Sequence, residues 1–258
     1  VHGHNNVYGA TIFPQNIGLG ATNNPELVFK ISEATSIEVA ATGIDWTFSP
    51  CLSSPEDYRW GRTYEGYSSD PALVEKLGEA SVMGYQSAQT YSGKKVVACA
   101  KHFIGDGGTF KGIDKGDTRI NESGLKNIHG VPYYAAINAC VQSIMASFNS
   151  WNGKKLHGYE YLLTDVLRNE MQFEGLVVGD WNGHGEVPGC TNANCPQSFN
   201  AGVDIYMAPD EWKELYTNTV RAVKSGDISE DRLDDAVRKI LTVKDRLGML
   251  DGRKPHEY

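Results

Sequence analysis

The sequence has no long hydrophobic run and no cluster of basic residues, and each absence excludes a class of partner. No apolar stretch approaches the ~20 residues needed to span a bilayer. Acidic residues outnumber basic ones by 32 to 24, and the formal net charge is −8. Nucleic acids and anionic membranes attract basic patches, so we expect neither as a partner. No signal peptide is visible after Val1, and in a longer protein it would lie upstream.

Cysteine is also scarce, and its placement separates two kinds of position. Of the five cysteines, Cys99 and Cys140 lie in apolar runs and are expected to be reduced core residues. Cys190 and Cys195 flank a polar tetrapeptide, and this spacing suits a small disulfide ring. A metal site is the weaker alternative, because two thiols lack a third and a fourth ligand. A disulfide predicts a periplasmic or secreted setting.

Pairs of histidine and aspartate elsewhere do not make metal motifs. His2 and His4 precede two asparagines and fit a hydrogen-bonded loop better than a metal pair. Asp114 and Asp117 lack the closing Glu and the central Gly of an EF-hand loop, so we expect them in a solvated loop. We therefore predict no metal and no cofactor.

One apolar segment, residues 176–179, ends in a single carboxylate, Asp180. Parallel α/β folds keep their catalytic groups at the carboxyl ends of strands, which makes Asp180 a candidate nucleophile. The alternative is that Asp180 caps the glycine-rich turn formed by residues 182–185, which is the commoner role of a lone Asp after a strand. Other residues must decide between the two.

Two further apolar segments lead to cations. Residues 96–100 run into Lys101 and His102 where the chain bends into a glycine-rich loop, so both side chains can reach one pocket. A surface Lys beside a loop-bonded His is the alternative. Residues 44–48 lead to Arg59, which stands between two aromatic residues. Stacking can hold such a guanidinium while its planar fork binds adjacent hydroxyls. Together the three segment ends indicate a sugar site.

Four short motifs resemble glycoside hydrolase family 3 in order and in spacing. They are VHGHNN at residues 1–6, RWGR at 59–62, KHF at 101–103 and GDW at 179–181. The resemblance extends to about Gly248 and is strongest to exo-acting β-glucan glucohydrolases. It implies a retaining β-glucosidase or exo-β-glucanase that acts on a β-glucoside or β-glucan oligosaccharide. Such an enzyme hydrolyses terminal non-reducing β-D-glucosyl residues and releases glucose.

The resemblance also implies roles for individual residues. Asp180 corresponds to the catalytic nucleophile, which forms the covalent glycosyl-enzyme intermediate. Neighbouring cations would keep its carboxylate ionised by lowering its pKa. Trp181 corresponds to a wall of the first sugar subsite, and two cations and a histidine correspond to residues that bind the hydroxyls of the terminal glucose. The full set of substrate-binding residues implied in this way is Arg59, Lys101, His102, Trp181 and Met145.

Other family features are replaced or lie outside the chain. Plant members place a Tyr thirty-two residues before the nucleophile, where this chain has Phe148. The resemblance puts a sugar-binding Asp two residues before Val1 and the acid/base Glu in a sandwich-like domain after the barrel. We therefore expect residues 1–250 to form a partial catalytic (β/α) barrel, truncated at its N-terminus. Residues 251–258 are expected to begin a linker to a missing second domain.

Two other functions are weighed against the glucosidase. The β-N-acetylglucosaminidases of the same family place a His-Asp dyad in the loop after the Lys-His pair, but residues 105–119 contain no His. A non-catalytic or inactive glycan-binding fragment would keep the sugar-binding residues and lack the acid. Retention of Asp180 argues against such degeneration.

The expected fold class is α/β, a (β/α)8 TIM-like barrel that is incomplete in this chain, because eight strands are required. Helix signals are strong after Asn24 and Asp70, each of which precedes a Pro, and after Ser229, which precedes an apolar repeat ending at Gly248. We expect this last helix to close the barrel and pack on the core. The six candidate strands lie near residues 11–13, 44–48, 96–100, 143–148, 176–179 and 203–207.

Overall fold

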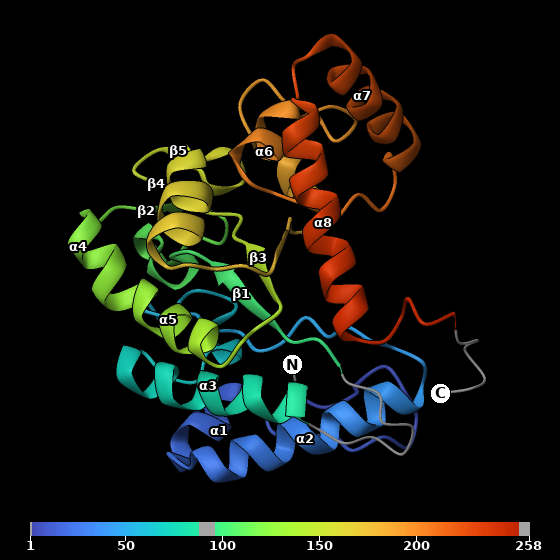
Figure 1. The fold of residues 1–258 in the computed structure, drawn as a ribbon. Helices are drawn as coiled ribbons and strands as arrows, with labels where there is room; N and C mark the ends of the chain where they lie inside the picture. The colour runs from blue at the N-terminus through green and yellow to red at the C-terminus, as the bar shows by residue number, and fades with distance from the viewer. Residues whose placement is uncertain (1, 88–95, 253–258) are drawn as a thin grey trace.

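The computed structural model describes residues 2–87 and 96–252, which form helices around short strands (Figure 1). Two segments, η4 (Leu125–Gly130) and η6 (Tyr161–Glu170), are π-helical. The α-helices in the described ranges are α1 (Asn16–Thr22), α2 (Pro25–Ala41), α3 (Pro71–Ser87), α4 (Glu122–Gly124), α5 (Val131–Asn138), α6 (Pro196–Ala201), α7 (Trp212–Ser225) and α8 (Glu230–Arg246). The strands are β1 (Cys99–Phe103), β2 (Asp117–Thr118), β3 (Ser143–Ala146), β4 (Ser150–Trp151), β5 (Lys154–Lys155) and β6 (Leu176–Val178).

Three parallel strands form the central sheet, in the order β1-β3-β6. Parallel bridges extend it at both edges, where Trp46 pairs with Val97 and Ile205 pairs with Val178. Consecutive segments are joined through α3, α5, η6 and α6, since parallel neighbours need such crossovers. The three strands and the two bridged segments run side by side as part of a barrel. The predicted fold class, an incomplete α/β barrel, is confirmed.

Alternate residues of the sheet face two apolar clusters, as the two-residue period of a strand requires. The residues that face the larger cluster, with α3, α5 and η6, are Ala98, Ala100, Ile144, Ala146 and Val177. The residues that face the other cluster, with Trp46 and Val243, are Val97, Cys99, Met145, Leu176 and Val178. Asp180 is two residues beyond Val178, so it continues the face of the second cluster.

The second sheet lies outside the barrel, where β2 pairs in parallel with β4 and β4 pairs antiparallel with β5. These two-residue strands follow β1 and β3 and carry the chain from the sheet to the site loops. In the C-terminal part of the chain, α7 and α8 pack together with α6 in a smaller cluster around Phe199 and Ile228.

The helix signals in the sequence are confirmed. Asn24 caps α2 by accepting from the Leu27 amide, and Ser229 caps α8 by accepting from the Arg232 amide. Asp70 accepts from the Ala72 amide at the start of α3. The packing expected of α8 is confirmed only in part, because Val237 in its apolar repeat is 43% exposed.

The strand predictions are confirmed for three of the six segments: those at 143–148 and 176–179 contain β3 and β6, and that at 96–100 overlaps the start of β1. The segments at 44–48 and 203–207 enter the sheet only as bridges at Trp46 and Ile205. The segment at 11–13 is a wrong prediction of a barrel strand, because Ile12 forms an antiparallel bridge with Gly3. Its partner is a neighbouring loop, and the local apolar pattern carries no information about that pairing.

Two further predictions concern the apolar cysteines and the C-terminal linker. Cys99 is buried as expected, but Cys140 is exposed, because it sits in a turn with positive φ after α5 rather than inside the apolar run. Of the predicted linker, residues 253–258 lie outside the described residues.

A buried ion-pair cluster holds β6, η6 and α8 together. The Asp204 carboxylate is fully buried and accepts hydrogen bonds from Arg168, from Arg232 at 2.9 Å and from the Val177 amide at 2.8 Å. Burial lowers the pKa of Arg168 against the pull of this carboxylate. One side chain therefore fixes a strand and two helices, and its partners depend on its charge.

Removing the Asp204 carboxylate should be strongly destabilising, because two largely buried guanidinium groups lose the buried carboxylate that bonds both of them. We expect Asp204→Ala to lower the free energy of unfolding by about 3–5 kcal/mol in urea denaturation. Glu26→Ala is the control, since it breaks an exposed pair with Lys30 and should leave the midpoint nearly unchanged. Equal losses in the two variants would contradict the role given to Asp204.

Candidate active site

Two loops and the end of a strand meet at the carboxyl end of the parallel sheet. The loop after β6 carries Asp180, β1 contains Lys101 and His102, and a loop ending in η1 (Thr63–Glu65) carries Arg62. His102 joins them, because its Nε2 lies 3.6 Å from Asp180 Oδ2 and 2.9 Å from Arg62 Nη2. The structure thus brings together the ends of separate sheet segments at the edge where barrel enzymes carry their sites.

The carboxylate of Asp180 is buried and is held through one oxygen only. Oδ1 accepts the Trp181 amide at 2.7 Å. Oδ2 makes no hydrogen bond within the described residues and faces His102. One oxygen of this carboxylate is therefore oriented by the backbone, and the other has no hydrogen bond to the described residues.

His102 is held by a second carboxylate, Asp106, in η2 (Asp106–Gly108). His102 Nδ1 lies 2.8 Å from Asp106 Oδ2, and Asp106 also accepts from the Ser53 hydroxyl and the Gly107 amide. Burial alone would lower the pKa of His102, but the hydrogen bond to Asp106 raises it to about 9. The ring is therefore a cation at neutral pH, and its Nε2–H faces Asp180.

Arg62 adds a second cation beside the ring. It donates to Glu65 at 2.7 and 3.0 Å, and these bonds raise its pKa although burial opposes the charge. A guanidinium can only donate, so its contact with His102 Nε2 is a hydrogen bond only when the ring is neutral. We favour the charged ring, because three carboxylates at the site, Asp106, Asp180 and Glu65, then face three cations, His102, Arg62 and Lys101.

Arg59, which the sequence predicts as a substrate-binding residue, lies outside this cluster. Its side chain is 71% exposed and pairs with Asp57 two residues earlier, whereas the side chain of Arg62 is 28% exposed. The second arginine of the motif at 59–62, and not the first, reaches His102. Sequence reasoning missed Arg62 although it stands in the same motif.

The remaining predicted substrate-binding residues have three different surroundings. Lys101 is half-buried on the sheet face that leads to Asp180, and its charge acts on Glu65. Trp181 is 60% exposed beside Asp180, so a ligand can reach its indole. Met145 is buried in the second apolar cluster, in register with Lys101 and Val178. Met145 packs beneath the site rather than lining its surface.

Three other acidic residues at or near the site are held in their ionised form. The hydrogen bond to His129 lowers the pKa of Glu56. Burial alone would raise the pKa of Glu65 and of Asp106, but bonds from Arg62 and His102 lower both. A general acid for glycoside cleavage needs a raised pKa, so none of the three suits that role.

His157 and Phe148 lie beside each other next to Asp180. His157 lies in η5 (Leu156–Gly158), and its Nε2 accepts the Asp180 amide at 2.9 Å. Burial lowers the pKa of His157 to about 4, so the neutral ring keeps the lone pair that accepts. The Phe148 ring centroid lies 5.9 Å from that of His157 and 3.9 Å from Lys115 Nζ. Nothing in the sequence indicated His157, which lies outside the four motifs.

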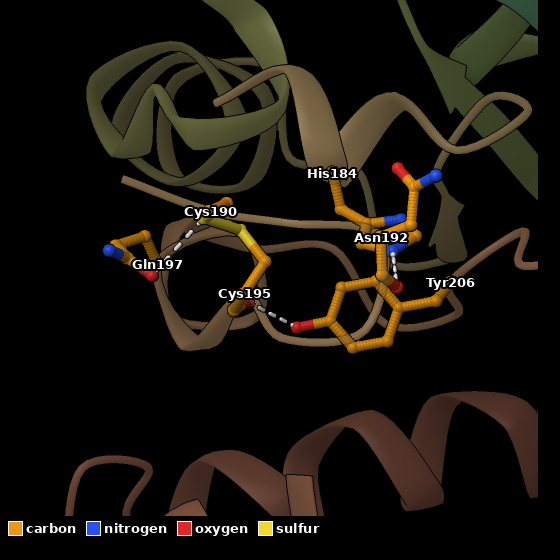
Figure 2. Close-up of a disulfide and its surroundings, with 6 residues drawn as sticks. All are labelled: His184, Cys190, Asn192, Cys195, Gln197 and Tyr206. Atoms are coloured by element: carbon orange, nitrogen blue, oxygen red, sulfur yellow. Dashed lines mark hydrogen bonds between the residues drawn. A yellow bond between two sulfur atoms is a disulfide. The ribbon is translucent and has the colours of Figure 1, made fainter. Parts of the chain in front are cut away.

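The loop beyond Asp180 is closed by a disulfide. Figure 2 shows Cys190 bonded to Cys195 across the intervening tetrapeptide. His184 Nε2 lies 2.8 Å from the Asn192 carbonyl inside this ring, and the Tyr206 hydroxyl donates to the Cys195 carbonyl. The ring is thus tied both to η7 (Gly183–Glu186) and to the segment that flanks β6.

Other polar side chains form separate contacts. His2 is bonded to Gln15, and His4 is bonded to Thr42. Across residues 2–87 and 96–252, no group of three or more His, Cys, Asp or Glu is placed to hold a metal ion. In the same ranges, no helix has the length and apolar character needed to cross a bilayer.

Comparison with known proteins extends this description. The chain is 34% identical over 271 residues to a lysosomal beta glucosidase of Dictyostelium discoideum, covering 99% of this chain and 32% of that protein. It is 31% identical over 251 residues to a periplasmic beta-glucosidase of Salmonella typhimurium, covering 95% and 32%. The chain therefore spans about a third of the length of these relatives.

A solved structure gives a closer match. An exo-1,3/1,4-beta-glucanase from a Pseudoalteromonas species superposes with a TM-score of 0.94 at 51% identity, over 98% of this chain and 32% of that one. The sequence also matches, over residues 1–243, the family described as the glycosyl hydrolase family 3 N terminal domain. The chain therefore belongs to glycosyl hydrolase family 3, whose N-terminal domain it carries.

Proposed function

We propose that this chain supplies the nucleophile and the sugar-binding cluster of a retaining, exo-acting β-glucosidase or β-glucanase. One observation carries the proposal: Asp180, two residues beyond β6, has an unbonded oxygen that faces a charged histidine. Family membership and the relatives named as β-glucosidases and an exo-glucanase support it.

In the proposed mechanism, Asp180 Oδ2 attacks the anomeric carbon of a terminal β-D-glucosyl residue. The bond to the leaving oxygen breaks, and a glycosyl ester forms on Asp180, which water then hydrolyses with net retention. Arg62, Lys101 and His102 present donors to the sugar hydroxyls, since each carries N–H groups at the rim of the same cluster.

The proton donor for this reaction is proposed to lie outside the chain. Glu56, Glu65 and Asp106 all have lowered pKa values, and each already bonds a cation or a histidine. His102 is charged, but its Nε2–H faces the nucleophile rather than a leaving group. The proposed source is a Glu in a following domain, as the family resemblance implies.

The proposed substrate is a neutral β-glucoside or β-glucan oligosaccharide, with glucose as the product. Arg62 pairs with Glu65, His102 lies against Asp106 and Asp180, and the charge of Lys101 acts on Glu65, so positive and negative groups are balanced in the cluster, which suits a neutral substrate. Trp181, exposed beside the nucleophile, offers a flat apolar face to a sugar ring. The Cys190–Cys195 disulfide and the periplasmic relative support a periplasmic or secreted setting.

The nucleophile can be tested by trapping. Incubating the full-length gene product with 2,4-dinitrophenyl 2-deoxy-2-fluoro-β-glucoside should leave a covalent fluoroglucosyl group on Asp180, located by peptide mass spectrometry. An Asp180→Asn variant should remain unlabelled. Label on another carboxylate would contradict the assignment. Binding of cellobiose without any labelling would indicate a glycan-binding protein, and preference for N-acetylglucosaminides would indicate the other enzyme branch.

The two arginines of the motif should behave differently. We expect Arg62→Met to lower kcat/KM for an aryl β-glucoside by at least about tenfold, because charged hydrogen bonds are worth about 1.5–3 kcal/mol. The matched control is Arg59→Met, which removes an exposed side chain paired with Asp57 and should stay within about twofold. The reverse order of effects would place Arg59, as the sequence suggests, in the site.

The charge on His102 should appear in the pH dependence of stability. Asp106 raises the pKa of His102 to about 9, so this stabilisation is complete below about pH 6.5 and is lost as pH rises through about 9. We expect the wild-type free energy of unfolding to fall across this window, and Asp106→Asn to remove that component of the slope. Urea midpoints measured at several pH values between 6 and 10 give the comparison, and parallel curves for the two proteins would show that His102 is neutral.

A further inference from the structure

The structure assigns His157 a role in the proposed reaction: we infer that it is a positioning residue that fixes the backbone of the nucleophile Asp180. The inference rests on the proposed function, in which Asp180 attacks the sugar. The key contact is the hydrogen bond from the Asp180 amide to His157 Nε2, at 2.9 Å. His157 comes from η5, so a different part of the chain sets the position of residue 180.

The partners of the neighbouring amides show why this contact matters. The amides of Gly179 and Asn182 donate to the carbonyls of Ile205 and Met207, at 2.8 and 2.9 Å. The amides of Trp181 and Gly183 donate to Asp180 itself, to its carboxylate and its carbonyl. Of the five amides from 179 to 183, that of Asp180 is thus the one bonded to a side chain from another element. A change at position 157 therefore acts directly on residue 180.

The ring of His157 has little freedom to move. It is 2% exposed, and a Cβ placed on Gly183 would lie 2.3 Å from its Nε2 and 2.4 Å from its Cε1. A Cβ on Gly179 would lie 3.4 Å from Cδ2, at the edge of ordinary contact. The loop after β6 therefore closes over the ring, and Gly183 is required there because any side chain would displace the histidine.

The accepting role also requires a neutral ring, since a protonated histidine has no lone pair to offer. Asp180, Glu186 and a hydrogen bond with the Ser147 backbone favour protonation of His157, and the neighbouring His184 opposes it. Burial outweighs the groups that favour protonation and keeps the pKa of His157 at about 4. The ring can thus hold the amide at neutral pH and does not donate a proton to the substrate.

The experiment separates positioning from folding by comparing variants of the full-length protein. The readout is labelling by 2,4-dinitrophenyl 2-deoxy-2-fluoro-β-glucoside, which gives the first-order labelling rate constant and the dissociation constant separately. His157→Leu removes the acceptor, and we expect the rate constant to fall on the order of 10–100-fold with the dissociation constant nearly unchanged. His157→Gln places an amide oxygen near the position of Nε2, and we expect it to recover most of the rate.

Two further variants control the interpretation. Gly183→Ala leaves the histidine in the sequence but pushes its ring aside, so it should reproduce the slower labelling expected of His157→Leu. If His157→Leu fails to fold, Gly183→Ala tests the positioning role in its place. His129→Leu removes another buried histidine, one that contacts Glu56, and should lower the thermal midpoint without slowing labelling. Wild-type labelling rates in a folded His157→Leu, or equal losses in His157→Leu and His157→Gln, would overturn the inference. Absence of wild-type label on Asp180 would instead overturn the proposed function.

Discussion

The parallel hydrogen-bonded ladder of β1, β3 and β6 sets where Lys101, His102 and Asp180 lie at the site. In this ladder Lys101, Met145 and Val178 stand in register on one face of the sheet, and Asp180 follows on the same face. Because side chains alternate between the faces, a shift of one residue would turn Lys101 and Asp180 toward the helices. The apolar clusters on the two faces fix that choice, since each accepts only the residues of its own side. Packing thus determines which polar groups meet.

Burying these charged groups costs desolvation free energy, which ion pairs within the site offset. A single buried carboxylate would be destabilised or protonated. Here Asp106 binds His102, Glu65 binds Arg62, and the charge of His102 stands against Asp180. The pairs with Asp106 and Glu65 are local, four and three residues apart, whereas that of His102 with Asp180 joins two strand ends and forms only when the sheet is assembled. Of the carboxylate oxygens in these three pairs, Asp180 Oδ2 is the one without a hydrogen bond to any described residue.

The elements predicted well from the sequence are those whose determinants are local. The caps at Asn24 and Ser229 bond amides three residues away, so a short stretch of sequence contains the whole interaction. Strand pairing and side-chain direction depend on distant residues. Residues 11–13 have an apolar pattern but pair with Gly3, and Cys140 leaves its apolar run at a turn with positive φ.

The site also contains residues that the sequence predicts and residues that it does not. The family motifs located Asp180, Lys101 and His102, which the structure brings to one edge of the sheet. They did not distinguish Arg59 from Arg62, because two arginines in one four-residue motif differ only in the direction that the loop gives them. His157 could not be found, since its contact is with a backbone amide 23 residues away and no side-chain pattern records it.

The disulfide beyond Asp180 restricts the conformation of a few nearby residues more than it stabilises the whole fold. A ring of six residues removes little conformational entropy from the unfolded chain, so its effect on global stability is small compared with a cross-link between distant segments. Its effect is instead local: it restricts the few residues that present the Asn192 carbonyl to His184. In an oxidising compartment, the disulfide therefore preorganises residues 190–195 and their contact with His184. In a reducing compartment, the same residues would have to be ordered each time a ligand binds.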